Sequence, residues 1–187
     1  MTSIRAGAGL STRTARHAAA EYSTVREHAV GEMLFGLARA AIGFIFLWAF
    51  LDKLFGLGKA TPSAKAWING GSPTTGYLSG VEGPFAGFFN GMAGKAWADW
   101  LFMLGLAGLG LALILGIGMW VAAVTGPLLL IFMWMASLPI ASNPFLDEHL
   151  IYAVVILAVA FSGEGLRYGL APWWRSLPIV QKWAWLK

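Results

Sequence analysis

The sequence predicts an all-α integral membrane protein, a four-helix bundle with an outward loop that contains a short interfacial helix. Of its 187 residues, 58% are hydrophobic and only 12% are charged, whereas soluble domains are about a quarter charged. The mean hydropathy is +0.67. Residues 100–146 carry no charged side chain, and an apolar run of about 18 residues or more is long enough to cross a bilayer.

Residues 1–30 are predicted to form a mobile cytoplasmic tail. The segment lacks an apolar core of signal-peptide length, so we expect no cleaved signal. A helix is expected near residues 16–30, where it would run along the membrane surface.

The membrane domain is predicted to cover residues 31–171, with its first span at residues 31–57. The apolar core of this span is bounded by Arg39 on one side and by Asp52 and Lys53 on the other. Adjacent residues of a helix point about 100° apart. We therefore expect one member of the Asp52-Lys53 pair to face into the bundle and the other to face the surface.

The uncharged block is about twice as long as one span of about 20 residues requires, so it should contain two spans. We place them at residues 98–115 and 120–138, on either side of the sequence GIGM at 116–119. A break at Thr125-Gly126-Pro127 is the alternative, but proline is tolerated inside membrane helices and we expect only a kink there. The glycines of residues 105–116 suit close helix packing rather than dinucleotide binding, because no strand precedes them.

The fourth span is predicted at residues 150–170. The tail that follows, residues 172–187, combines tryptophan with lysine, arginine and proline, which is typical of the headgroup level of a membrane. Four spans place both termini on one side of the membrane. Because both terminal segments are rich in cationic residues, the positive-inside rule predicts that this side is the cytoplasm.

Residues 58–97 form the predicted outer loop. Its first part is dense in turn-forming residues, and its second part groups aromatic residues at helical spacing with glycines between them. A connection of this length is usually functional or disordered, and the aromatic content argues against disorder. We therefore expect a short interfacial or re-entrant helix that covers the outer end of the bundle.

Ionisable residues within the predicted spans fall into two layers, because the fourth span runs antiparallel to the first. The inner layer holds Arg39, Glu164 and Arg167. We expect these three residues to form a structural ion pair that avoids a lone charge in lipid. Truncation of Glu164 should then harm expression, because Arg39 would lose its partner.

The outer layer is the candidate functional site. We predict His149, Asp52 and Lys53 as catalytic residues that share one cavity, since imidazole transfers protons near neutral pH and lysine attracts anions. The predicted substrate or quinone pocket adds Trp67, Phe88, Phe89, Asp99, Trp100, Asn143 and Glu148. An alternative is that Asp147 and Glu148 merely begin a helix, where acids interact favourably with the helix dipole.

Residue counts narrow the cofactors. The chain has no cysteine and three histidines, of which His17 and His28 lie in the tail. We therefore expect no haem, no iron–sulfur cluster, no NAD and no metal site. The net charge of +4 is explained by membrane topology, so no nucleic acid is expected as a partner. The remaining candidates for a redox partner are a lipid-soluble quinone and a cofactor on another subunit.

Four segments occur in order within residues 33–165: LARAAIGFIFLWAFLDKLFGLG, AWINGGSPTTGYL, WADWLFMLGLAGLGLALILGIGM and NPFLDEHLIYAVVILAVAF. They resemble the DoxX/DoxD family of small four-helix bacterial membrane proteins. The residues within the likeness include Arg39, Asp52, Lys53, Trp67, Asn143 and His149. The resemblance implies a multi-pass protein of the bacterial inner membrane. The style of the sequence also suggests an actinobacterial source, where the quinone would be menaquinone.

The family includes the membrane subunit of thiosulfate:quinone oxidoreductase, whose second subunit is not visible in this chain. The resemblance therefore implies a membrane subunit of a quinone-linked redox system, with thiosulfate or a related sulfur compound as a candidate donor. The alternative is a non-catalytic module that docks or stabilises a respiratory or oxidative-stress complex. A solute or lipid carrier ranks third, because four spans show no inverted repeat. Expected partners are the lipid bilayer, other membrane or redox subunits, and a second copy of the chain.

Overall fold

The computed structural model describes residues 5–141 and 143–187, and every regular element in this part of the chain is a helix. The long helices are α1 (Arg5–Phe55), α4 (Ala96–Leu115), α5 (Met119–Ala136) and α6 (Glu148–Ser162). The short ones are η1 (Ser63–Lys65), η2 (Trp67–Asn69), α2 (Thr75–Leu78), α3 (Ala86–Asn90), η3 (Leu166–Tyr168), α7 (Ala171–Ser176), α8 (Pro178–Lys182) and η4 (Ala184–Leu186). The predicted all-α class is confirmed.

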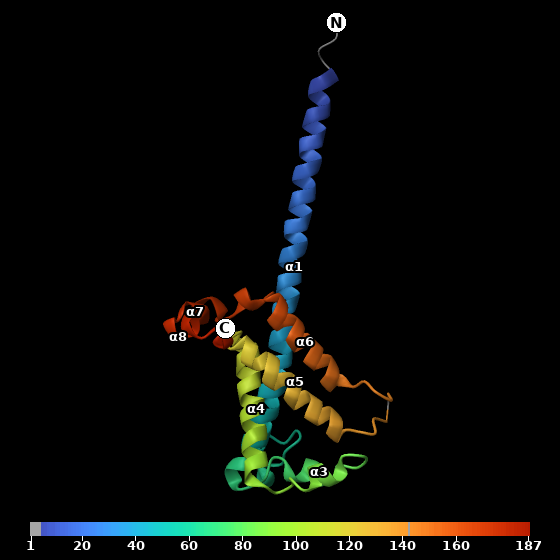
Figure 1. Cartoon of the computed structure of the whole chain (residues 1–187), viewed down its shortest axis with the longest axis vertical. Helices are drawn as coiled ribbons and strands as arrows, with labels where there is room; N and C mark the ends of the chain where they lie inside the picture. Colours follow the sequence, from blue (N-terminus) through green and yellow to red (C-terminus); the bar gives the residue numbers. More distant parts are fainter. Residues whose placement is uncertain (1–4, 142) are drawn as a thin grey trace.

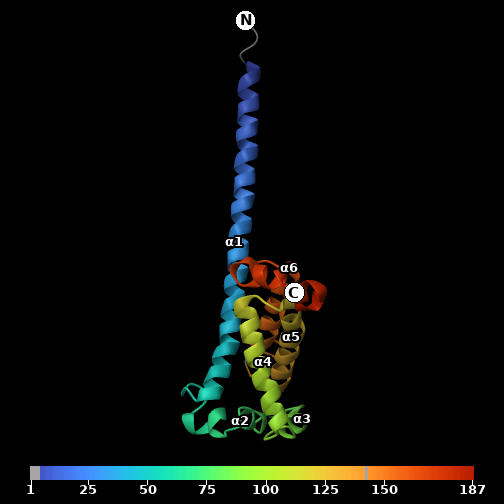
Figure 2. The same ribbon diagram turned by 90° about the vertical axis from the view of Figure 1, so that its left-hand side faces the viewer.

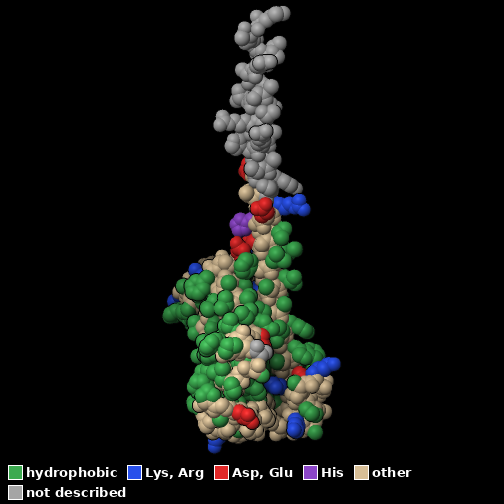
Figure 3. All heavy atoms as spheres, turned by 90° about the vertical axis from the view of Figure 1, so that its right-hand side faces the viewer, with side chains coloured by type: hydrophobic (Ala, Val, Ile, Leu, Met, Phe, Trp, Pro, Cys, Tyr) green, Lys and Arg blue, Asp and Glu red, His purple; other side chains and the backbone are tan. Residues whose placement is uncertain are grey.

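Three of these helices are long and apolar enough to cross a membrane: Thr24–Phe55 within α1, α4 and α5. On the face shown in Figure 3, hydrophobic side chains cover the flank of the bundle, and charged side chains gather towards its ends. Leu101, Val124 and Val154, from three different helices, are each more than 60% exposed. Such a continuous apolar flank is what a bilayer covers.

Helix α1 is 51 residues long and continues without a break through the predicted tail boundary at residue 30. Its C-terminal half packs against α4, while its N-terminal half projects beyond the bundle as a single rod (Figures 1 and 2). The helix predicted near residues 16–30 is thus present, but as part of α1 and not as an element separate from the first span. The reason is local, because residues 5–55 contain no proline and many alanines, which favour one uninterrupted helix.

Glycines allow α1 and α4 to approach closely. A Cβ atom placed on Gly110 would lie 2.7 Å from the backbone nitrogen of Leu47, and one on Gly43 would lie 2.9 Å from Leu113 Cβ. Both contacts are too short for any larger residue, so the helix-packing role predicted for the glycines of residues 105–116 is confirmed at Gly110. The adjoining core is built from Met103, Leu106, Leu130, Ile156 and Val159.

Helices α4 and α5 meet at the predicted break. Gly116 and Gly118 have φ values of 72° and 59°, a left-handed conformation that ends one helix before the next begins. Helix α5 runs through Pro127 without interruption. The alternative break at Thr125-Gly126-Pro127 is therefore wrong.

Helix α6 is shorter than the predicted fourth span. It ends at Ser162, because Gly163 and Gly165 adopt φ values of 68° and 72°, and Glu164 and Arg167 consequently lie outside it. With 15 residues, α6 still returns the chain to the α4–α5 turn, where Trp120 N donates to Lys187 O at 3.2 Å. Helices α7, α8 and η4 lie across that end of the bundle (Figure 1).

The connection between α1 and α4 (residues 56–95) covers the opposite end of the bundle (Figure 2). Helix α3 lies where the sequence predicts a short helix. It is held by a second apolar cluster, to which Leu78, Val81, Phe89 and Ala136 contribute. This connection shapes the candidate site.

Candidate functional site

Asp52 is buried and points at the start of the α1–α4 connection. Its side chain is 2% exposed, and its two carboxylate oxygens accept the backbone N–H groups of Lys59 at 3.1 Å and Ala60 at 3.0 Å. Thr61 adds hydrogen bonds from its backbone and its hydroxyl. A carboxylate surrounded by such donors holds a loop in place, so Asp52 is an anchor rather than a group open to a substrate.

Asp99 anchors the other end of the same loop. It lies in the first turn of α4 and is 8% exposed. Its Oδ1 accepts the Ser72 hydroxyl at 2.8 Å, the Thr74 N–H at 3.1 Å and the Thr74 hydroxyl at 2.5 Å. The two buried carboxylates thus hold residues 59–75 from both sides. The sequence predicted an anchoring role for neither Asp52 nor Asp99.

Between these anchors lies a cleft of about 600 Å³, which we call the lysine cleft. Its lining residues are Lys53, Ala60, Thr61, Pro62, Ala64, Lys65, Asn69, Gly70, Gly71, Ser72, Pro73, Thr75, Gly76 and Tyr77. Two lysines line it and no acidic side chain does. Lys53 Nζ also lies 6.0 Å from the centroid of the Phe102 ring, a cation–π contact. Asp52 and Lys53 point in different directions, as predicted, but Asp52 is buried under the loop and not inside the bundle, while Lys53 lines the cleft.

The predicted aromatic pocket residues form two separate clusters instead of one pocket. Trp67 and Trp100 make an edge-to-face contact with ring centroids 4.6 Å apart. Phe88 and Phe89 contact each other at 5.1 Å and both contact Phe132 of α5. None of the four predicted aromatic residues lines the lysine cleft. Their role in the structure is to fasten the connection onto α4 and α5.

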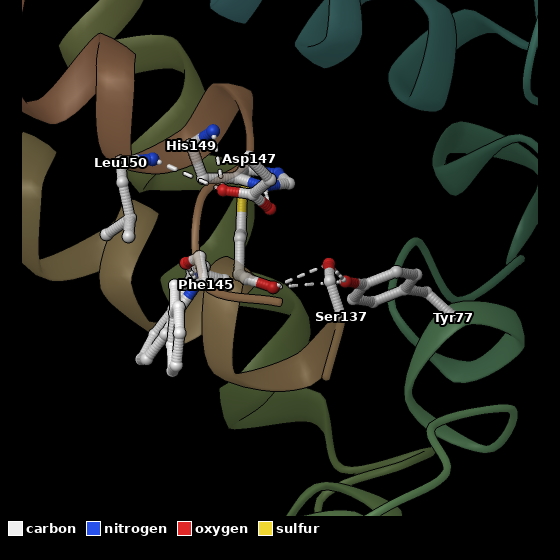
Figure 4. A network of polar contacts seen from close by, with 8 residues as sticks. Tyr77, Ser137, Phe145, Asp147, His149 and Leu150 are labelled. Carbon is white, nitrogen blue, oxygen red and sulfur yellow. Dashed lines mark hydrogen bonds and ion pairs between the residues drawn. The ribbon is translucent and has the colours of Figure 1, made fainter. Parts of the chain in front are cut away.

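His149 belongs to a dyad with Asp147, shown in Figure 4. Its Nδ1 lies 2.6 Å from Asp147 Oδ2, and the two side chains are only 15% and 8% exposed. The other Asp147 oxygen accepts the backbone N–H groups of His149 at 3.1 Å and Leu150 at 3.3 Å, so Asp147 also caps α6. Asp147 is a site residue that the sequence prediction left out, and the signal for it was an acid two positions before the histidine at a helix start.

A Tyr77–Ser137 pair is drawn in the same polar network in Figure 4. The Tyr77 hydroxyl lies 3.4 Å from Ser137 Oγ, which donates to Met133 O at 2.9 Å. Both residues line a second pocket of about 280 Å³. Because Tyr77 lines the lysine cleft as well, its ring lies between the two hollows.

Asn143 and Glu148 are exposed and lie outside both hollows. Asn143 Oδ1 accepts the N–H groups of Phe145 at 2.9 Å and Leu146 at 3.0 Å, which stabilises a turn. Glu148 begins α6, as the alternative interpretation expected. Neither residue contributes to the lysine cleft or to the second pocket.

Arg39 is 1% exposed, yet its partners differ from those predicted. Its guanidinium donates to the carbonyls of Leu113, Ile114 and Gly165. Among the described residues, no carboxylate lies within ion-pair distance of it. The last carbonyls of α4 have no helical partner and carry the negative end of the helix dipole, so they can replace an acid.

The predicted ion pair among Arg39, Glu164 and Arg167 is therefore wrong. Arg167 Nε contacts Glu32 Oε2 at 2.6 Å, and Glu164 lies 3.9 Å from His28 Nδ1. A hydrogen bond to the Tyr168 hydroxyl, together with the Glu32 carboxylate, raises the pKa of Arg167. Glu32 was missed because it lies about two helical turns before Arg39, outside the predicted layer.

Asp52 and His149 do not share a cavity in the described structure. The Asp52 carboxylate is occupied by residues 59–61, His149 is bound to Asp147, and neither lines the lysine cleft. No group of three or more His, Asp or Glu side chains that could hold a metal ion occurs in the part of the chain that the structure describes. No family model matches this chain, and neither a curated protein nor a solved structure gives a match. The DoxX/DoxD resemblance stays a prediction.

Proposed function

We propose that this chain is a membrane subunit of a quinone-linked redox system, and that its lysine cleft receives a small sulfur-containing anion such as thiosulfate. The observation that carries the proposal is the charge of the cleft. Lys53 and Lys65 both line it, and no acidic residue is among its lining residues, because the neighbouring Asp52 carboxylate is bound to the backbone of the α1–α4 connection. Two lysines on a hollow without acidic lining residues favour a small anion over a neutral or cationic ligand.

The proposed reaction balances without a bound cofactor. Two thiosulfate ions each lose one electron and join through a new S–S bond, which gives tetrathionate. One quinone, menaquinone in this proposal, takes up the two electrons and two protons and becomes the quinol. Because Asp147 holds His149 through Nδ1 at 2.6 Å, the imidazole is oriented to pass a proton through Nε2.

The orientation in the membrane belongs to the same proposal. We place the chain in the bacterial inner membrane with both termini in the cytoplasm, so that the lysine cleft opens outside. The α1–α4 connection, which supplies most of the cleft's lining residues, and the C-terminal helices lie at opposite ends of the bundle (Figure 2). This arrangement fits an outer anion site and a cationic cytoplasmic end.

The direct test is thiosulfate-dependent reduction of a menaquinone analogue by the purified full chain in native lipids. We expect quinol formation that saturates with thiosulfate and is lost in the variant K53Q/K65Q. The variant K59Q/K95Q removes the same number of lysines, both from the α1–α4 connection and neither lining the cleft, and should retain it. Quinone binding without turnover in the parent protein would refute the catalytic role.

A non-catalytic docking module is the second candidate, and one observation favours it. Helix α1 presents Val30, Met33, Leu34 and Leu37 at exposures between 45% and 64%, close to where it leaves the bundle. A membrane or redox subunit, or a second copy of this chain, could cover such a stripe. Purification in mild detergent would then yield a stoichiometric complex, whereas a chain that is always isolated alone would contradict this role.

A further inference from the structure

The C-terminal residues 171–187 form a fixed unit, which we call the tail platform. Val180 at its centre is 0% exposed. Trp174 Nε1 donates to Leu186 O at 2.5 Å, and Trp120 N of α5 donates to Lys187 O at 3.2 Å. Just before it, Leu170 N donates to Leu115 O at 2.7 Å. These bonds hold the platform across the α4–α5 end of the bundle, from which it projects sideways in Figure 1.

The outer surface of the tail platform is both aromatic and cationic. Trp173, Ile179, Trp183 and Trp185 are between 49% and 59% exposed. The cations are Arg175, Lys182 and Lys187, and no acidic residue occurs in residues 171–187. Lys182 Nζ lies 5.8 Å from the Trp183 ring centroid. Exposing this much indole to water costs free energy. A partner that complements the surface therefore has both apolar groups and negative charge.

The apolar flank of the bundle leads directly to this surface. Trp120 at the start of α5 stacks edge-to-face on Phe161 of α6 with centroids 5.2 Å apart, and Phe161 is 71% exposed. If α4 and α5 cross the bilayer, the α4–α5 end lies at the headgroup level. Tryptophan prefers this level, and lysine and arginine are attracted there by anionic lipid.

We propose that the tail platform binds the anionic phospholipid headgroups of the leaflet next to the α4–α5 turn, with its tryptophans in the interface and its three cations on phosphates. Charge complementarity selects this occupant, because the platform carries three cationic side chains and no acidic side chain. The proposal goes beyond the redox function and does not depend on it. It would make the composition of this leaflet a determinant of how the chain sits in the membrane.

The test uses the full chain in vesicles and the absence of cysteine, which allows a single label. A bimane fluorophore on the exposed position Ala184 (A184C) is quenched by lipids with brominated acyl chains. We compare brominated phosphatidylglycerol with brominated phosphatidylcholine, each at the same low mole fraction in unlabelled phosphatidylcholine. Local enrichment of the anionic lipid should make its quenching at least about twofold stronger.

Two charge variants are compared in the same label background. R175Q/K182Q/K187Q removes the platform cations and should make the two lipids quench equally. K59Q/K65Q/K95Q removes the same number of cations from the connection at the opposite end and should keep the preference. In the parent protein, raising salt from about 0.1 M to about 1 M shortens the Debye length from about 10 Å to about 3 Å and should weaken the preference without any substitution.

Each other result overturns the proposal. Equal quenching in the parent protein would mean no anionic preference. Equal loss in both charge variants would assign the effect to net charge and not to the platform. A label that neither brominated lipid quenches would place the platform against water or a protein partner.

Discussion

Asp52 and Lys53 show how adjacent residues divide structural and functional work. The Asp52 carboxylate is saturated by N–H groups of the α1–α4 connection, while Lys53 lines an open cleft. The two adjacent charged residues therefore have different roles. Asp52 holds the loop that forms the cleft, and Lys53 faces the space inside the cleft.

Replacing Asp52 by Ala should destabilise the protein. It removes the charged acceptor of the Lys59 and Ala60 N–H groups, and a hydrogen bond to a charged group contributes about 1.5–3 kcal/mol. We expect a clear drop in the thermal unfolding midpoint in detergent. Glu82→Ala, an exposed acid of the same connection, is the matched control and should leave the midpoint unchanged.

Lys53→Gln should instead impair anion binding while the fold stays intact. Loss of one hydrogen bond to a charged group, about 1.5 kcal/mol, corresponds to about a tenfold rise in the KM for thiosulfate. Lys95→Gln should leave this KM as it is. An unchanged KM in Lys53→Gln with a normal unfolding midpoint would remove Lys53 from the site.

His149→Ala should reduce redox turnover with little loss of stability. The Asp147 carboxylate still caps α6 through the N–H groups of residues 149 and 150, so the helix keeps its start. Turnover of the menaquinone analogue and the unfolding midpoint, measured on the same preparation, separate the two effects. A loss of folded protein would show that the imidazole is structural.

At the scale of elements, Arg39 joins three parts of the chain. It extends from α1 to the C-terminal carbonyls of α4 and to Gly165 beyond α6. A Cβ on Gly116 would lie 3.0 Å from Arg39 Nη1, and one on Gly169 would lie 3.2 Å from Nη2. Two glycines thus make room for one guanidinium, and the C-terminal segment is held to the bundle through it.

Arg39→Met should therefore be far more harmful than Glu164→Ala. The first change leaves buried helix-end carbonyls without a donor and should cost about 3 kcal/mol or more. The second removes a side chain that is 30% exposed and bound only weakly, at 3.9 Å, to His28. Yields of folded protein from size-exclusion chromatography would show the order. An equal loss of folded protein in both variants would instead support the predicted ion pair between Arg39 and Glu164.

At the scale of the whole molecule, α6 brings the chain back to the end of the bundle where α4 and α5 meet, and the C-terminal segment stays there (Figure 1). Helix α6 has only 15 residues, about 22 Å at 1.5 Å per residue, yet it returns the chain to the level of Trp120. In the proposed topology α6 crosses the membrane, which would require a bilayer that thins locally or headgroups drawn inward by the neighbouring tryptophans.

Impermeant thiol reagents would test this topology on intact cells, because the chain has no cysteine of its own. A cysteine at Glu82 should react from outside, whereas cysteines at Glu27 and Ala184 should react only after lysis. Reaction of the cysteine at 184 in intact cells, with the one at 27 protected, would show that α6 does not cross.

The sequence by itself determined the helical class, the apolar stretches and the break at Gly116–Gly118. Each of these depends on composition over neighbouring residues or on a glycine's own backbone freedom, and both are local properties. Sequence reasoning also separated Asp52 from Lys53 by helical geometry alone. The predictions were wrong where a polar group has several distant residues as alternative partners with similar interaction energies.

Only the tertiary structure decided that Arg39 bonds to helix-end carbonyls instead of Glu164, that Asp52 and Asp99 anchor a loop, and that His149 pairs with Asp147. A buried cation can be satisfied by backbone carbonyls as well as by a carboxylate, and a buried carboxylate by backbone N–H groups as well as by a cation. Every residue supplies a carbonyl, and every residue except proline supplies an N–H. Which of them comes within about 3 Å depends on where loops and helix ends are brought by packing, and no pattern along the chain encodes that distance.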